Sequence, residues 1–419
     1  MKLVFFLIMG LLILFFPAAQ ENSLNWDIDS IFDEPFPFDE SSEDSGDSSK
    51  SSSSGDSSVL DEVMRPGLVF DASFEFVTGI FPGYPEVPWE SKKDFAWKPG
   101  MKMVAGFGLD ARISPVVRVK STFNFLFPDF NFTLGDFFFD YNMYDVIFFR
   151  GGKYIHSWGV SPNFGFTDLL ARVPSDGGGD SYLFRADIPL GIGGFQFLAL
   201  TRADLKVSPE ITRRDFGYGA KYNLAFTWAD FNWGTYYKFG MPLRSFLSVK
   251  TTVGDTELYT EGLLAVDVDE TDDYTGAVSF GFARDFFGDK IGVNGEFVYN
   301  AEKNSFWFRP ESGVREAETP LAVDGINLAF NVFYRFGGKA NPRLFFQSRY
   351  APSQNSAMIV PGFRLKPLTH IEVYLAVPMS LGSKDGYYYG NTEEPNGRPF
   401  CVMLLVSLKG NISAEYYTK

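Results

Sequence analysis

The chain has 419 residues, a formal net charge of −15 and an aromatic fraction of 18%, with 47 Phe. The negative charge argues against a nucleic-acid partner, because the phosphate backbone binds basic surfaces. The single cysteine, Cys401, excludes a disulfide framework and a multi-cysteine metal site, and two histidines leave little material for a zinc site. We therefore expect neither a metal nor a cofactor.

Residues 1–20 have the three-part build of a secretory signal peptide: one lysine, an apolar run from Leu3 to Phe16, and small residues at Ala18 and Ala19. The apolar run is shorter than the roughly 20 residues that a membrane-spanning helix needs. A retained membrane anchor is the alternative. The signal peptide predicts that the protein is exported.

Residues 21–65 are rich in serine and acids, with 13 Asp/Glu against Lys50 and Arg65. Such a composition cannot bury enough apolar surface to offset the entropy of ordering, so we predict a disordered segment. Within it, apolar and acidic side chains alternate over residues 25–38. This stretch is either a docking motif for a partner or part of the linker. The whole segment is expected to act as a tether to a basic periplasmic partner or as a spacer.

Residues 66–419 alternate apolar and polar side chains with the period of a β-strand. In VRVKSTFNFLF at 117–127, valines and phenylalanines share one parity, whereas Arg118, Lys120, Thr122 and Asn124 share the other. The same pattern predicts about 18 strands, at 67–78, 102–114, 116–127, 131–141, 145–156, 181–190, 195–203, 215–229, 231–240, 246–254, 257–266, 274–284, 290–300, 326–337, 342–350, 357–366, 370–380 and 399–409.

The connections between these strands alternate in length. Long ones fall at 79–101, 157–180, 204–214, 301–325 and 381–398, and between them lie short turns such as Ser114-Pro115, Asp230, Asp255-Thr256 and residues 337–341. Transmembrane barrels have long outer loops and short periplasmic turns, whereas a Greek-key sandwich has no reason to sort its loops in this way.

We therefore predict an all-β fold, an antiparallel transmembrane β-barrel over residues 66–419, with 18 strands and 16 as the main alternative. A bilayer requires every backbone polar group to be satisfied internally, and a closed sheet achieves this. The second interpretation is a soluble extracellular β-sandwich or β-helix. Two features fit the barrel poorly: Pro361 falls inside a predicted strand, and the chain ends in Lys419 rather than an aromatic residue. Its last ten residues either extend the final strand or add a short one.

In a barrel of this kind the apolar parity faces lipid and the other parity lines a lumen wide enough for water. Lys and Arg outnumber Asp and Glu on the inward parity by 12 to 7. Rings of cations favour anions in a pore. The alternative is that these cations merely pair with nearby carboxylates. The predicted pore-lining residues are Arg112, Arg118, Lys120, Arg185, Lys221, Lys238, Lys250, Arg335 and Arg349.

The two long connections 157–180 and 301–325 are candidates for an inward-folding constriction or an exposed binding surface. Carboxylates at 175–180 lack the ligand spacing of a calcium loop, so a flexible turn is expected there. His156 and Ser157 are neighbours in sequence, but no acid partner is indicated, so we predict no catalytic residues. Cys401 is expected to be a small packing residue.

The hairpin at 137–160, FFFDYNMYDVIFFRGGKYIHSWGV, resembles a pattern in bacterial outer-membrane porin-like barrels. There an aromatic strand, a short turn and a strand ending in Gly-Lys precede a Trp-Gly and a long loop; here these are Gly152-Lys153 and Trp158-Gly159. The Phe-rich composition and the acidic serine tract are similar to those of spirochaete examples. The resemblance implies a cell outer-membrane location, outer-membrane lipid as solvent, and assembly by the barrel-assembly machinery.

The predicted function is passive diffusion of small hydrophilic solutes through the outer membrane, with a weak preference for anions. Two other classes stay open: a transporter of hydrophobic compounds, and a surface-exposed adhesin that uses the barrel as a scaffold. Fold alone does not separate these, because function depends on the sites built on it.

Overall fold

The computed structural model describes residues 67–80, 83–84, 99–128, 130–154, 156, 158–164, 182–201, 216–239, 241–268, 274–301, 324–383, 386 and 400–417. The predicted signal peptide and acidic segment at 1–65 lie outside these residues. Within the part of the chain that is described, no helix is long and apolar enough to cross a membrane.

One sheet contains all of the 21 strand segments. They are β1 (Gly67–Ile80), β2 (Gly83–Tyr84), β3 (Pro99–Ser114), β4 (Val117–Phe127), β5 (Asn131–Met143), β6 (Ile147–Lys153), β7 (Tyr182–Leu190), β8 (Gly193–Thr201), β9 (Phe216–Ala225), β10 (Ala229–Lys238), β11 (Leu243–Val253), β12 (Thr256–Val266), β13 (Tyr274–Phe286), β14 (Ile291–Asn300), β15 (Gly325–Arg335), β16 (Arg343–Ala351), β17 (Ser356–Leu368), β18 (Ile371–Ala376), β19 (Met379–Gly382), β20 (Phe400–Cys401) and β21 (Met403–Tyr417). A single 3-10 turn, η1 (Pro352–Gln354), lies among the described residues.

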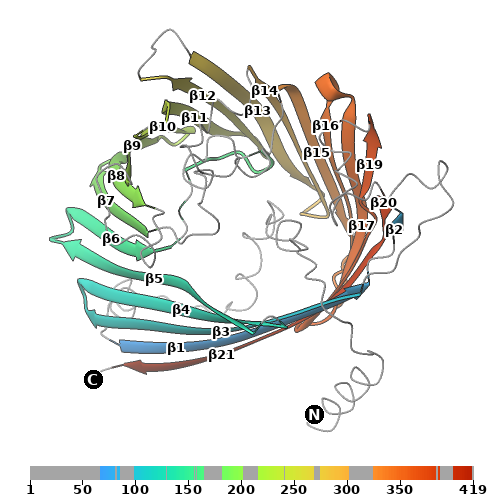
Figure 1. Ribbon diagram of the computed structural model, residues 1–419, viewed down its shortest axis with the longest axis horizontal. Helices are drawn as coiled ribbons and strands as arrows, with labels where there is room; N and C mark the ends of the chain where they lie inside the picture. Colours follow the sequence, from blue (N-terminus) through green and yellow to red (C-terminus); the bar gives the residue numbers. More distant parts are fainter. Residues whose placement is uncertain are drawn as a thin grey trace.

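The sheet closes on itself. β1 pairs antiparallel with β21 along its whole length, from Gly67 opposite Tyr417 to Ile80 opposite Leu404, and the ring of strands is visible end-on in Figure 1. The short segments β2, β19 and β20 continue β1, β18 and β21 after brief interruptions, which leaves 18 strands around the barrel. The prediction of an 18-stranded antiparallel barrel is confirmed.

Eight short turns join alternate pairs of strands at one end of the barrel, here called the turn end. One predicted turn was misplaced: Asp230 belongs to β10, and the turn after β9 spans residues 226–228. The Phe226 N–H bonds to the Ala229 carbonyl at 2.9 Å, and the Phe226 and Trp228 rings stack 6.0 Å apart. This turn has no Gly or Asn and carries aromatic side chains, so its sequence is typical of a strand and the turn was not predicted there.

The two features that fitted poorly have local explanations. The Pro361 carbonyl accepts the Val377 N–H at 2.9 Å. Pro361, which has no N–H to donate, therefore lies beside the interruption between β18 and β19. No strand pairing is lost there, because in an antiparallel strand the N–H and C=O of one residue point to the same neighbour. The last residues extend β21 as far as Tyr417, which was one of the two predicted outcomes.

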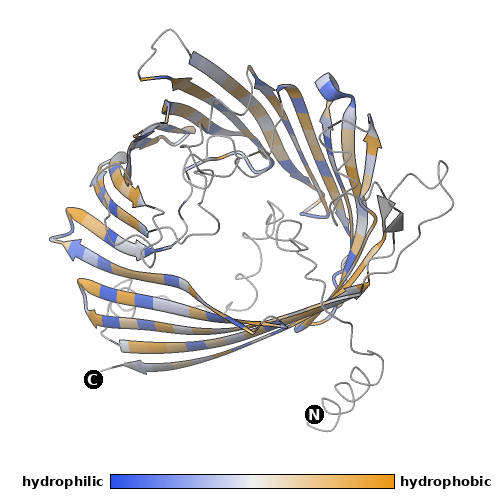
Figure 2. Ribbon diagram, in the orientation of Figure 1, coloured by the Kyte–Doolittle hydropathy of each residue, from blue (hydrophilic) through white to orange (hydrophobic). Residues whose placement is uncertain are grey.

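The barrel exterior is apolar. Large hydrophobic side chains stand exposed on the outward parity, including Phe107, Trp233, Leu247 and Phe280. Apolar and polar residues alternate along the strands in Figure 2. Inside, however, a buried hydrophobic cluster occupies part of the lumen and includes Leu198, Phe246 and Leu263 on inward positions of β8, β11 and β12. The parity that was predicted to line the lumen therefore carries apolar side chains in this part of the wall.

Candidate functional site: the barrel lumen

The chain enters the lumen directly after β6. The described residues 154, 156 and 158–164 are here called the lumenal segment. They include Trp158 and Phe164, which are 2% and 0% exposed. The Trp158 ring packs 5.8 Å from that of Phe246 on β11, and it lies against Gly219 on β9, where a Cβ atom would meet it at 2.6 Å. The apolar inward residues of β8, β11 and β12 thus form the surface on which this segment packs.

Two buried carboxylates on the far wall bind the backbone of the lumenal segment. Glu261 on β12 accepts the N–H groups of Val160 and Ser161 at 2.6 and 3.2 Å. Glu296 on β14 accepts the Asn163 N–H at 3.1 Å and the Ser161 hydroxyl. Hydrogen bonds to an ionised acceptor are about twice as strong as neutral ones. The segment is therefore held across the lumen from β6 to β14.

Strands β15 and β16 complete this anchorage. The Asn331 amide donates to the Asn163 side-chain oxygen at 2.6 Å, and the Arg349 guanidinium donates to the Asn163 carbonyl at 3.2 Å. The Arg349 guanidinium also lies 5.9 Å from the Phe164 ring centroid. Of the two alternatives predicted for the connection at 157–180, an inward-folding constriction or an exposed binding surface, residues 158–164 follow the inward course. Residues 165–181 and 302–323 lie outside the described residues.

At the near wall, Gln196 on β8 joins the lumenal segment to the barrel. Its side-chain oxygen accepts the Trp158 indole N–H at 2.5 Å and lies 2.9 Å from His156 Nε2. Its amide nitrogen donates to Asp187 at 2.7 Å. Arg185 binds Asp187 at 2.7 Å and places a guanidinium nitrogen 3.3 Å from His156 Nδ1.

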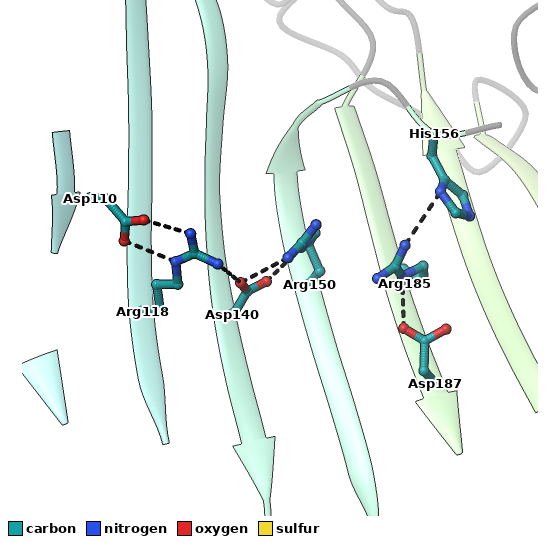
Figure 3. A network of polar contacts seen from close by, with 7 residues as sticks. All are labelled: Asp110, Arg118, Asp140, Arg150, His156, Arg185 and Asp187. Carbon is teal, nitrogen blue, oxygen red and sulfur yellow. Dashed lines mark hydrogen bonds and ion pairs between the residues drawn. The ribbon is translucent and has the colours of Figure 1, made fainter. Parts of the chain in front are cut away.

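Opposite charges alternate across β3 to β6 (Figure 3). Asp110 receives two hydrogen bonds from Arg118, at 2.8 and 2.5 Å. Asp140 lies 3.8 Å from Arg118 and receives two bonds from Arg150, at 2.6 and 2.9 Å. These residues come from separate strands, and only the barrel register brings them into one row.

The row opens onto a recess of about 790 Å³ at the turn end of β3 to β10. Its charged lining consists of five cations and two carboxylates, so positive charge is in excess, and amides complete the polar surface. The charged and amide side chains of the lining are Arg112, Arg118, Arg150, Arg185, Lys221, Asp140, Asp187, Asn142, Gln196, Asn223 and Asn232.

The nine predicted pore-lining residues fall into three groups. Four of them line this recess: Arg112, Arg118, Arg185 and Lys221. Three lie elsewhere with a defined neighbour: Lys250 pairs with Glu257 at 2.9 Å, Arg335 lies 4.9 Å from the Phe333 ring, and Arg349 holds the lumenal segment. Lys120 lies opposite Asp110, and Lys238 ends β10. Contact of any of the nine with a solute stays a prediction.

Sequence reasoning missed several polar residues of the lumen. Arg150 was not assigned to the inward face because it has the same parity as the apolar Phe148. Aligning the hairpin would have predicted its pairing with Asp140, which lies directly opposite it. Arg244 was missed because the predicted strand began at 246; it is 1% exposed and lies 5.0 Å from the Tyr236 ring. Gln196 gave no signal, since its role depends on a loop that is distant in sequence.

No family model and no curated protein matches the chain. Solved structures do match. OpdQ of Pseudomonas aeruginosa aligns over 83% of this chain and 98% of its own, with 8% identity and a TM-score of 0.52. OccAB4 of Acinetobacter baumannii aligns over 82% and 98%, with 9% identity and a TM-score of 0.51. OpdK of Pseudomonas aeruginosa, crystallised with vanillate, aligns over 82% and 99%, with 10% identity and a TM-score of 0.50. The chain is similar in fold to these bacterial barrels.

Proposed function

We propose that the protein is an outer-membrane channel through which small hydrophilic solutes diffuse, with a weak preference for anions. The observation that carries this proposal is a closed 18-stranded barrel with an apolar outer face and a charged recess in its lumen. A closed barrel satisfies its own backbone, so lipid can surround it. Barrels of 16 to 18 strands leave room for water inside.

The weak anion preference follows from the balance of paired and excess charge. Arg118, Arg150 and Arg185 each contact a carboxylate, which reduces the field that they present to a solute. The recess nevertheless keeps five cations against two carboxylates. Charged rings set the selectivity of a pore, and a partly neutralised set favours anions only modestly.

The reversal potential of the channel under a KCl gradient in a planar bilayer tests this preference. We expect a small anion-selective potential, which Arg112→Glu reverses or abolishes because Arg112 lines the recess. Lys290→Glu makes the same charge change at an exposed turn after β13 and should leave the potential within error of the wild type. Cation selectivity of the wild-type channel would contradict the proposal.

The same recordings separate the competing functions. A stable ohmic conductance supports a solute channel, whereas a closed barrel that binds apolar compounds supports a transporter of hydrophobic molecules. Adhesion that depends on the loops, without conductance, supports a binding scaffold. Because the OpdK structure was determined with vanillate, vanillate is the first solute to test in liposome-swelling assays. We propose no enzymatic activity, since the described contacts of His156 are with Gln196, Arg185 and the Tyr154 ring.

The role of residues 21–65 stays a proposal: they tether the barrel to a basic periplasmic partner. Deleting residues 40–60 and comparing co-purified proteins tests this, and an unchanged set would leave the segment as a spacer. Assembly by the barrel-assembly machinery and the spirochaete resemblance also stay predictions.

A further inference from the structure

The protonation state of His156 is defined by its neighbours. Trp158 can only donate, so the Gln196 atom that accepts its indole N–H is the amide oxygen. His156 Nε2, 2.9 Å from the same oxygen, must therefore carry a proton. Arg185 can only donate, so His156 Nδ1 must accept from it. These contacts are compatible only with neutral imidazole protonated at Nε2.

A second proton on His156 would break one of these hydrogen bonds and place a positive charge next to other cations. Nδ1–H would point at the guanidinium of Arg185, and Lys221 on β9 is the other nearby cation. Asp187 is the nearby carboxylate on these strands, and it is already bound by Arg185 and Gln196. Burial, the Arg185 guanidinium and the Lys221 ammonium lower the pKa of His156, although the Gln196 bond opposes the shift.

We propose that His156 is a pH-sensitive latch that holds the first part of the lumenal segment against β7 and β8 when neutral and releases it when protonated. The released histidine accepts a proton near the ordinary value of about 6.5, so the latched form loses stability as pH falls below that value. The bonds that Glu261 and Glu296 accept hold the far part of the segment, so release is confined to the part around His156.

The chain has only two histidines, His156 and His370, so NMR of protein labelled with ¹⁵N-histidine in nanodiscs gives two ring systems. His370→Gln, in the turn between β17 and β18, assigns them. We expect His156 to be the Nε2–H tautomer at pH 7.5 and to titrate with a midpoint below the ordinary histidine value of about 6.5. Arg185→Gln should raise the midpoint, because it removes the cation that faces Nδ1. An Nδ1–H tautomer, or a midpoint insensitive to Arg185→Gln, would overturn the latch.

The effect of the latch on solute flow rests on the proposed channel function and is measured separately. Between pH 7.5 and 5 we expect wild-type single-channel conductance to rise and its open-state noise to increase, as the part of the segment around His156 leaves the wall. His156→Gln should abolish this response, whereas His370→Gln should retain it. A pH response that persists in His156→Gln would overturn the latch. Absence of any current in all variants would instead contradict the channel, and the NMR titration would still decide the latch.

Discussion

Glu296 shows how a single side chain positions the lumenal segment. It is 4% exposed on β14 and accepts from Ser161, from the Asn163 N–H and from Tyr259 at 3.2 Å. A carboxylate is suited to this position because it offers acceptors only, in two oxygens that face a cluster of donors. An apolar or amide replacement would leave buried donors without partners.

Glu296→Gln should therefore loosen the lumenal segment without unfolding the barrel. Losing a hydrogen bond to a charged group costs about 1.5–3 kcal/mol. We expect the amides of residues 160–164 to exchange at least about tenfold faster in hydrogen–deuterium exchange mass spectrometry. The control is Glu257→Gln, since Glu257 is partly exposed beside the turn between β11 and β12 and pairs with Lys250. Equal exchange in both variants would show that Glu296 does not hold it.

Neighbouring strands of the barrel fit together through aromatic residues that cover glycines on the inward face. The Tyr259 ring on β12 lies over Gly281 on β13, where an added Cβ would come within 2.1 Å of the ring. The Tyr259 hydroxyl donates to Glu296, which binds the lumenal segment. The absence of a side chain at Gly281 therefore leaves room for a tyrosine that helps to position Glu296.

Gly281→Val should destabilise the barrel, because the valine displaces the Tyr259 ring and overpacking typically costs about 1–3 kcal/mol. We expect a lower temperature for the loss of the fast-migrating folded band in heat-modifiability gels. Gly262→Val on β12 is the matched control, since a Cβ there meets nothing within 4 Å. A Gly281→Val barrel as heat-stable as this control would contradict the packing described here.

At the scale of the whole molecule, the barrel depends on the closure between β1 and β21. Ser73 lies opposite Asn411, on the inward face of the seam. Antiparallel partners have Cα atoms about 4.5–5.5 Å apart, within the range of a disulfide. In a Cys401→Ser background, Ser73→Cys with Asn411→Cys should therefore crosslink on oxidation of the folded protein.

The control for this crosslink is Ser73→Cys with Ser407→Cys, because Ser407 lies opposite Val77, four residues out of register. Crosslinking of both pairs, or of neither, would contradict the closure. A 16-stranded barrel, the main alternative from the sequence, would require two of these strands to leave the wall.

The sequence predicted the wall of the barrel better than its contents. Strand number and the sorting of connections depend on local alternation and spacing, and both are confirmed. The contents depend on the lumenal segment, whose partners Glu261 and Glu296 lie about 100 or more residues away. Leu198 and Leu263 are inward and apolar because that segment covers them. Their strands therefore deviate from simple alternation, and the deviation was a signal of a filled lumen that period counting alone does not interpret.

The alternating row of Asp110, Arg118, Asp140 and Arg150 has a consequence for traffic through the pore. If the proposed channel conducts anions, an arriving anion would meet each guanidinium of this row already paired with a carboxylate, and that carboxylate would compete with the anion for the guanidinium. Such partner exchange would shorten the dwell time of each solute. High throughput requires sites that release readily what they attract, and a row built in this way would combine recruitment with rapid turnover.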